Sequence, residues 1–175
     1  MHKKRIAVIG IDGANKKIAS YIGIDKLGLG SSMLSTIPPY TPPAWTSIVT
    51  GVNPGKHGII GWKMVDRKKY FTRLTNANDV RYPRLFEILQ MKKLRSIIIN
   101  VPLTYPFTWI HDSERIIVVA DWASPKQTIF PRNLDDKYKK YLIKPPHARH
   151  GYHLQRSKRN IKEYIKKVEN FLAIR

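Results

Sequence analysis

The sequence predicts an α/β fold with a mainly parallel sheet flanked by helices. Three uninterrupted apolar runs carry this prediction, at residues 5–11, 96–101 and 115–120. Such runs, rich in β-branched residues, are typical of strands that are buried on both faces of a parallel sheet. Helical patterns fill much of the chain between and after the runs, and strands that alternate with helices indicate parallel connections. Residues 32–37 are predicted to form a fourth, shorter strand.

Four segments have helical character. Residues 15–22 predict a short first helix, and residues 42–50 a second one that ends at Gly51, a residue favoured just after a helix. A third helix is predicted from its N-cap Asp79 to its last turn, with apolar residues at helical spacing: Tyr82, Leu85, Phe86 and Leu89. The fourth has an apolar stripe on an otherwise charged segment, made of Ile161, Tyr164, Ile165, Val168, Phe171 and Leu172. Such a stripe requires burial against another surface.

Length and composition favour a single domain in a reducing compartment. The chain has 175 residues, enough to bury a core, and contains no cysteine. We expect residues 1–130 to form the N-terminal half of an α/β domain and residues 131–175 a basic helical extension of it. The basic N-terminus precedes only a short apolar run that Asp12 interrupts, so neither a signal peptide nor a membrane span is expected. These features predict a cytoplasmic protein.

The formal net charge of +20 indicates polyanionic partners. Nucleic acid, an acidic membrane surface or phosphorylated substrates would all suit such an excess of Lys and Arg. The alternative is a basic surface that is only solvated and binds no polyanion. The charge is densest at residues 137–167, where four tyrosines interleave with Lys and Arg. Phosphate contacts combined with stacking are the pattern of nucleic-acid binding, which is the alternative function here.

Asp12 follows the first predicted strand directly and precedes Gly13. Ligands gather at the carboxyl ends of the strands in open α/β sheets, and a carboxylate at that place suits a divalent cation. The alternative is that Asp12 caps the helix that begins near Asn15.

Thr41 stands before two prolines at the start of the second predicted helix. Its side chain suits an N-cap, and a helix N-terminus with N–H groups and a partial positive charge attracts anions. A hydroxyl there could attack a phosphoryl group, if a metal ion activated it. The alternative is that Thr41 only caps the helix.

Three segments together resemble a known family: residues 11–14, with Ile-Asp-Gly-Ala; residues 35–59, with Thr-Pro-Pro-Ala-Trp-Thr-Ser and Thr-Gly-Val-Asn-Pro-Gly-Lys-His-Gly-Ile; and residues 100–106, with Asn-Val-Pro-Leu-Thr-Tyr-Pro. They look like the type I phosphodiesterase and nucleotide pyrophosphatase branch of the alkaline phosphatase superfamily. Within it, the chain is most similar to prokaryotic phosphohydrolases and phosphomutases. The resemblance runs from about Ile6 to Asp121.

The resemblance implies a metal-dependent phosphohydrolase with an alkaline phosphatase-like fold and a phosphate ester substrate. It places the first metal-binding aspartate on Asp12 and the nucleophile, itself a metal ligand, on Thr41. Two divalent ions, usually zinc, and a phospho-threonine intermediate would follow. The phosphate-contacting Asn of the nucleotide pyrophosphatases falls on Ala44, so that contact is absent or replaced. No metal role falls on Asp121 or on His57, which is expected in a structural turn.

The family's later ligands, which include an Asp-His pair, have no match here. His111-Asp112 has the reverse order, and the histidines at 147, 150 and 153 lie in a basic segment with Pro and Gly. Asp12 and Thr41 alone cannot hold two zinc ions, since each takes about four ligands. We therefore expect an incomplete domain, truncated or split, with weak or no activity alone. The stripe at 161–172 would then meet a C-terminal half or a second copy of the chain.

Overall fold

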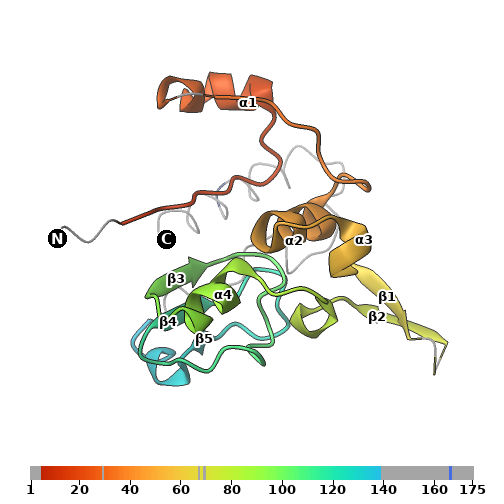
Figure 1. The fold of residues 1–175 in the computed structure, drawn as a ribbon, viewed down its shortest axis with the longest axis vertical. Helices are drawn as coiled ribbons and strands as arrows, with labels where there is room; N and C mark the ends of the chain where they lie inside the picture. Colours follow the sequence, from red (N-terminus) through yellow and green to blue (C-terminus); the bar gives the residue numbers. More distant parts are fainter. Residues whose placement is uncertain (1–4, 29, 67, 69, 139–165, 167–175) are drawn as a thin grey trace. The chain divides into compact units, whose positions relative to one another are not determined.

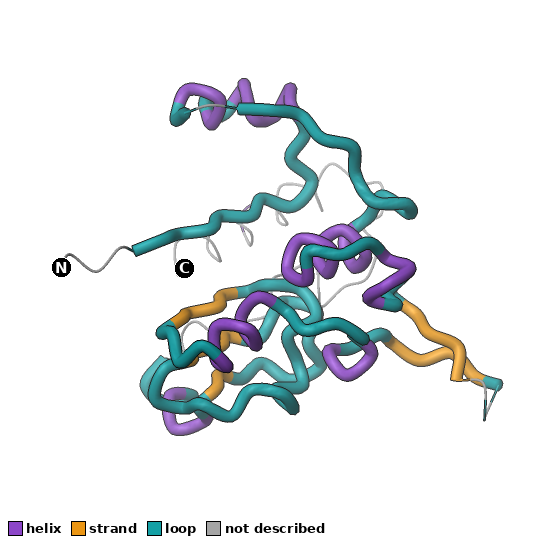
Figure 2. The backbone as a smooth tube through the Cα atoms, viewed as in Figure 1, coloured by secondary structure: helices purple, strands orange, loops and turns teal. Residues whose placement is uncertain are grey.

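The structure is a computed structural model that describes residues 5–28, 30–66, 68, 70–138 and 166. It divides the chain into two compact units, residues 1–35 and residues 36–175, each of which is considered by itself. Figure 1 follows the chain through its elements, and Figure 2 distinguishes helices, strands and loops. The predicted boundary at residue 130 remains a prediction.

The first unit contains the short helix α1 (Lys16–Tyr21) and the 3-10 turn η1 (Ile24–Lys26). Asn15 caps α1, because its side chain accepts a hydrogen bond from the Ile18 N–H at 3.0 Å. The helix predicted at residues 15–22 is therefore confirmed.

The strand predicted at residues 5–11 is absent from the described structure, and so is the one at 32–37. Ile6 and Val8 are 89% and 77% exposed rather than buried. A strand needs a neighbour to pair its backbone N–H and C=O groups, and the described part of the first unit holds no strand that could do so. Apolar content alone therefore overestimated the sheet.

The second unit contains a three-stranded sheet in the order β3-β4-β5. Strand β3 (Ser96–Ile99) runs parallel to β4 (Ile116–Val119), and β4 pairs antiparallel with β5 (Ile129–Phe130). The two strands predicted at residues 96–101 and 115–120 are confirmed, and so is an α/β class. The described sheet is mixed rather than mainly parallel.

The core lies on one face of this sheet, under helix α4 (Leu85–Met91). Its buried side chains come from the helix, both parallel strands and the loop between them: Phe86, Ile98, Ile110, Ile116 and Val118. The helix starts later than predicted, at N-cap Arg84 rather than Asp79. Pro83 explains the difference, because a proline disfavours the helical conformation of the residue before it, here Tyr82. Asp79 instead ends the 3-10 turn η2 (Ala77–Asp79).

The remaining elements of the second unit precede and follow this core. Helix α2 (Thr41–Thr50) confirms the helix predicted at residues 42–50, and the single turn α3 (Pro54–His57) follows it. The polar segment at 62–78 folds as an antiparallel hairpin of β1 (Lys63–Asp66) and β2 (Phe71–Leu74). The 3-10 turn η3 (Arg132–Leu134) comes after β5. The helix predicted at 161–172 lies outside the described residues except for Lys166.

Candidate functional site

Thr41 is the first residue of α2, and Tyr40 takes the N-cap position that was expected for Thr41. The helix therefore begins one residue earlier than predicted and ends, as predicted, at Gly51 with a φ of 71°. Thr41 is half-buried. A hydroxyl at the first helical position lies beside the helix N-terminus, where the partial positive charge of the helix is concentrated.

The expected cradle of backbone amides is largely missing at this helix start. Pro42 and Pro43 occupy the second and third helical positions and have no N–H to offer. The N–H of Ala44 donates to the Tyr40 carbonyl at 3.1 Å. Among the first three residues of α2, only Thr41 carries an N–H. A phosphoryl group at Thr41 would therefore need groups other than the helix amides to balance its charge.

Tyr40 fixes the chain where it enters α2. Its hydroxyl donates a hydrogen bond to the Ile60 carbonyl at 2.6 Å, across twenty residues of sequence. A Cβ at Gly61 would lie only 2.6 Å from this hydroxyl oxygen. Glycine at 61 is therefore what lets Tyr40 reach its partner. Sequence reasoning missed this contact, although Tyr40 stands directly before Thr41.

We predict that Gly61→Ala destabilises the protein by about 1–3 kcal/mol, the usual cost of overpacking. In a Tyr40→Phe background the hydroxyl is gone, so the same substitution should cost much less. Urea unfolding of the two single variants and the double variant measures this coupling. Additive effects of the two substitutions would show that the contact is not made.

His57 ties the end of α3 to α2. Its ring is fully buried; Nδ1 accepts a hydrogen bond from the Ile59 N–H at 3.1 Å, and Nε2 lies 2.9 Å from Ser47 Oγ. Because Nδ1 is an acceptor, the neutral ring carries its proton on Nε2 and donates it toward α2. His57 thus acts in a structural turn, as expected, and holds the helix that begins with Thr41.

The same geometry excludes a Ser47–His57 catalytic pair. A general base must accept the proton of the nucleophile, but Nε2 already carries a proton in this tautomer. Protonation of Nδ1 would break the bond from the Ile59 N–H. Burial lowers the pKa of His57, partly offset by a hydrogen bond with the Pro43 backbone.

This lowered pKa predicts a pH dependence of stability. The unfolded chain binds the His57 proton more tightly than the folded chain, so the free energy of unfolding should decline as pH falls below the ordinary value of 6.5. Above that pH the contribution is complete, and below it the slope should reach at most about 1.4 kcal/mol per pH unit. Urea unfolding between about pH 7.5 and 5 measures it.

The matched variants are His57→Gln and His111→Gln. His57→Gln should lower stability at pH 7.5 and flatten the slope of the free energy of unfolding against pH. His111→Gln should leave that slope unchanged, because His111 is exposed. A slope that His57→Gln leaves unchanged would contradict this assignment.

Asp12 lies in a turn of the first unit and is exposed. It does not cap α1, because Asn15 does. The capping alternative for Asp12 is therefore wrong. Asp12 and Thr41 belong to different units, so their joint metal site remains a prediction. Within the described ranges no group of three His, Cys, Asp or Glu residues could hold a metal ion, and the two expected oxygen ligands do not by themselves make a two-metal centre.

The carboxyl ends of β3 and β4 carry a polar network. Asn100, with a φ of 57°, accepts a hydrogen bond on Oδ1 from the Trp122 N–H at 3.1 Å. The buried Asp121 accepts from the Ala123 N–H at 2.8 Å and from the Ser124 hydroxyl at 3.1 Å. Burial raises the pKa of Asp121. These bonds give the Asp121 side chain a structural role in this loop.

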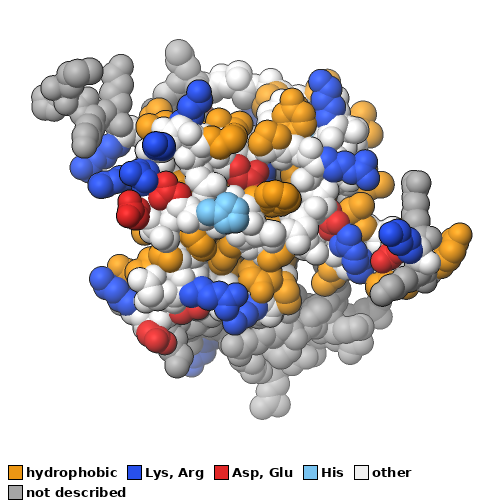
Figure 3. All heavy atoms as spheres, turned by 60° about the horizontal axis from the view of Figure 1, so that its bottom comes forward, with side chains coloured by type: hydrophobic (Ala, Val, Ile, Leu, Met, Phe, Trp, Pro, Cys, Tyr) orange, Lys and Arg blue, Asp and Glu red, His pale blue; other side chains and the backbone are white. Residues whose placement is uncertain are grey.

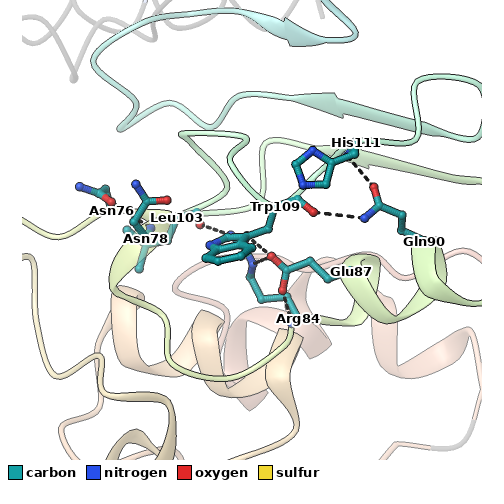
Figure 4. Close-up of polar contacts among 8 residues, drawn as sticks. All are labelled: Asn76, Asn78, Arg84, Glu87, Gln90, Leu103, Trp109 and His111. Carbon is teal, nitrogen blue, oxygen red and sulfur yellow. Dashed lines mark hydrogen bonds and ion pairs between the residues drawn. The ribbon is translucent and has the colours of Figure 1, made fainter.

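A buried arginine supports the loop after β3, as Figure 4 shows. Arg84 is only 2% exposed, forms an ion pair with Glu87, and donates to the Leu103 carbonyl at 2.9 Å. Its guanidinium also lies 4.7 Å from the centre of the Phe86 ring. Leu103 has a φ of 60° and follows Pro102 in the segment that resembles the family. Sequence analysis missed Arg84; the glutamate three residues later was the available signal.

Gln90 joins α4 to the loop before β4 in the same view. Its side-chain amide donates to the Trp109 carbonyl at 3.1 Å and accepts from the His111 N–H at 2.7 Å. Asp112 forms an ion pair with Arg115 at 3.1 Å. The reversed His111-Asp112 pair therefore belongs to the structure of this loop. The histidines at 147, 150 and 153 lie outside the described residues.

Comparison with protein families gives a match that covers most of the chain. The model of the family "Type I phosphodiesterase / nucleotide pyrophosphatase" matches residues 7–173. Comparisons with curated proteins and with solved structures give no match.

Proposed function

Because the chain belongs to the type I phosphodiesterase / nucleotide pyrophosphatase family, we propose that it is a phosphohydrolase in which Thr41 attacks the phosphorus of a phosphate ester. The observation that carries this proposal is the position of Thr41: half-buried, at the first residue of a helix that two side-chain contacts hold in place. One tie is the bond from Tyr40 to Ile60, and the other is the His57 ring against α2.

The proposed reaction has two steps. Thr41 Oγ forms a bond to phosphorus while the bond from phosphorus to the alcohol oxygen breaks, and the hydroxyl proton passes through solvent to the departing alcohol. Water then attacks the phospho-threonine, releasing phosphate or a phosphomonoester and restoring the Thr41 hydroxyl. Splitting one difficult displacement into two easier ones is the general advantage of a covalent nucleophile.

The metal requirement is part of the proposal. The family resemblance implies two divalent ions, zinc above all, which when bound would lower the pKa of a coordinated hydroxyl and stabilise a leaving oxygen. The resemblance places two of the ligands on Asp12 and Thr41, which belong to different units. The described residues do not fit a complete centre, so the steps above assign roles to Thr41 and water alone. Weak turnover by this chain is the expected consequence.

A chromogenic phosphodiester tests the function. Purified chain with Zn²⁺ or Mn²⁺ should release nitrophenolate from bis(4-nitrophenyl) phosphate slowly but above the rate without protein. The matching monoester, 4-nitrophenyl phosphate, distinguishes diesterase from phosphatase chemistry. Absence of turnover with both esters and both metals would contradict the proposal.

Nucleic-acid binding remains the alternative proposal, and the net charge of +20 is its support. Figure 3 shows Lys and Arg side chains in separate places on one face, with hydrophobic and acidic side chains between them. A binding groove for a polyanion would gather its cations along one track. The phosphohydrolase proposal is preferred because the family match supports it, whereas most of the segment in which the charge is densest, residues 137–167, lies outside the described residues. Among the described residues, no helix has the length and apolar character needed to cross a membrane.

A further inference from the structure

Two tryptophan rings meet at one edge of the sheet in the second unit. The ring centres of Trp62 and Trp122 lie 5.6 Å apart, and the rings cross edge to face at an interplanar angle of 61°. Both residues are half-buried, and neither is part of the core cluster under α4. In an edge-to-face pair one ring keeps both flat faces clear of the other ring, and the second ring keeps one. The pair can therefore offer an aromatic face to a third group.

Trp122 stands at the carboxyl ends of the two parallel strands. It lies just beyond the end of β4, and its N–H donates at 3.1 Å to Oδ1 of Asn100, which directly follows β3. The carboxyl group of its neighbour Asp121 bonds the Thr104 backbone in the loop after β3. Ligands of open α/β sheets gather beyond the carboxyl ends of the strands. Trp122 is therefore held at the edge of the sheet where a ligand is expected.

Trp62 connects the ring pair to the segment of Thr41. The hydroxyl of Tyr40, the residue before Thr41, bonds the Ile60 carbonyl at 2.6 Å, two residues before Trp62. On its other side, the Trp62 carbonyl accepts a hydrogen bond from the Thr75 N–H at 2.9 Å. The segment that carries Trp62 is thus tied directly to the segment that carries the proposed nucleophile.

We propose that Trp62 and Trp122 contact the organic group of the phosphate ester and select for an aromatic one. The proposal rests on the proposed function, because it gives the ring pair a place beside the substrate of Thr41. A flat aromatic group can stack on an open indole face, which should raise the affinity about tenfold over that of a group too small to stack. A pair that only packed two segments together would give no such preference.

Two phosphonates test the proposal without turnover, because their carbon–phosphorus bond is not hydrolysed. Phenylphosphonate carries an aromatic ring, and methylphosphonate is the same anion without it. Ligand-observed NMR titrations in the presence of Zn²⁺ measure both dissociation constants. The parent chain should bind phenylphosphonate about tenfold more tightly than methylphosphonate, and Trp122→Leu should remove that preference while leaving methylphosphonate binding unchanged. Equal affinities in the parent chain, or no binding of phenylphosphonate, would overturn the proposal.

Two further comparisons make the test specific to the ring pair. Trp109→Leu is the matched control, because Trp109 is 57% exposed and lies outside the pair; it should keep the preference. Trp62→Leu and Trp62→Phe repeat the test at the other ring: the leucine should lose the preference, and the phenylalanine, still aromatic, should keep most of it. Circular dichroism checks that each variant is folded. A preference that both leucine variants of the pair retain, or that Trp109→Leu loses equally, would overturn the proposal.

The Thr41→Ala chain separates this proposal from the proposed function. It lacks the oxygen of the nucleophile but keeps both rings, so its preference for phenylphosphonate should persist. An intact preference in a chain that hydrolyses neither chromogenic ester would contradict the proposed function alone. Hydrolysis of the esters by a chain that shows no preference between the phosphonates would overturn the role of the ring pair alone.

Discussion

Thr41→Ala should abolish hydrolysis of the phosphodiester, with a loss of at least about a thousandfold where the parent rate allows it to be measured. The substitution removes the oxygen that forms the bond to phosphorus. The fold should persist, because Thr41 is the first residue of α2 and alanine is a good helix former. Nitrophenolate release, followed at equal protein and metal concentrations, measures the effect.

Thr41→Ser is the matched control, because it keeps the hydroxyl and loses only a methyl group. It should retain a substantial part of the activity. Circular dichroism of all three proteins must be the same for the comparison to concern chemistry. Turnover that survives Thr41→Ala would exclude Thr41 as the nucleophile.

Arg84→Met should lower the free energy of unfolding by about 3–5 kcal/mol, the cost of removing one partner from a buried ion pair. Methionine keeps an apolar chain of similar length beside Phe86. It leaves the Glu87 carboxylate and the Leu103 carbonyl without the guanidinium that satisfies both. Urea unfolding at pH 7.5 measures the loss.

Two comparisons separate this effect from the loss of any arginine. Arg115→Met removes an ion pair with Asp112 from a side chain that is 38% exposed, and should change stability little. Arg84→Met/Glu87→Gln should recover part of the loss, since it removes the stranded charge as well. If Arg84→Met is no more destabilising than Arg115→Met, the buried ion pair does not stabilise the loop after β3.

Local signals predicted the elements that local chemistry determines. Pro42 and Gly51 bracket α2 by their backbone preferences, and Asn15 starts α1 through its own side chain. The strands predicted from the β-branched runs at β3 and β4 are also confirmed, because each strand pairs with the other. The run at 5–11 is likewise apolar and β-branched but has no partner strand in the described part of its unit. Strand formation depends on that partner, which apolar content cannot reveal.

In the candidate site, too, local features were predictable from the sequence and contacts between distant residues were not. Thr41 is a candidate from sequence, because its prolines and the segment through Ile59 make a long, specific motif, and its role as nucleophile stays a prediction. The ties that hold it could not be found from sequence, since Tyr40 and Ile60 meet across twenty residues. The amide cradle was predicted from a general rule about helix starts, and the two prolines that removed it were visible in the sequence. Pro42 and Pro43 have no N–H to donate, so the sequence itself limits the number of amides at this helix start.

The most direct test of the account is to look for the phosphoryl group on Thr41 itself. The chain would be mixed with bis(4-nitrophenyl) phosphate and Zn²⁺ or Mn²⁺, quenched in acid, digested, and examined by tandem mass spectrometry, with Thr41→Ala in parallel. The account predicts a substrate-dependent adduct on Thr41 that is absent from the variant. Turnover with an adduct on another residue, or an equal adduct in the variant, would contradict it.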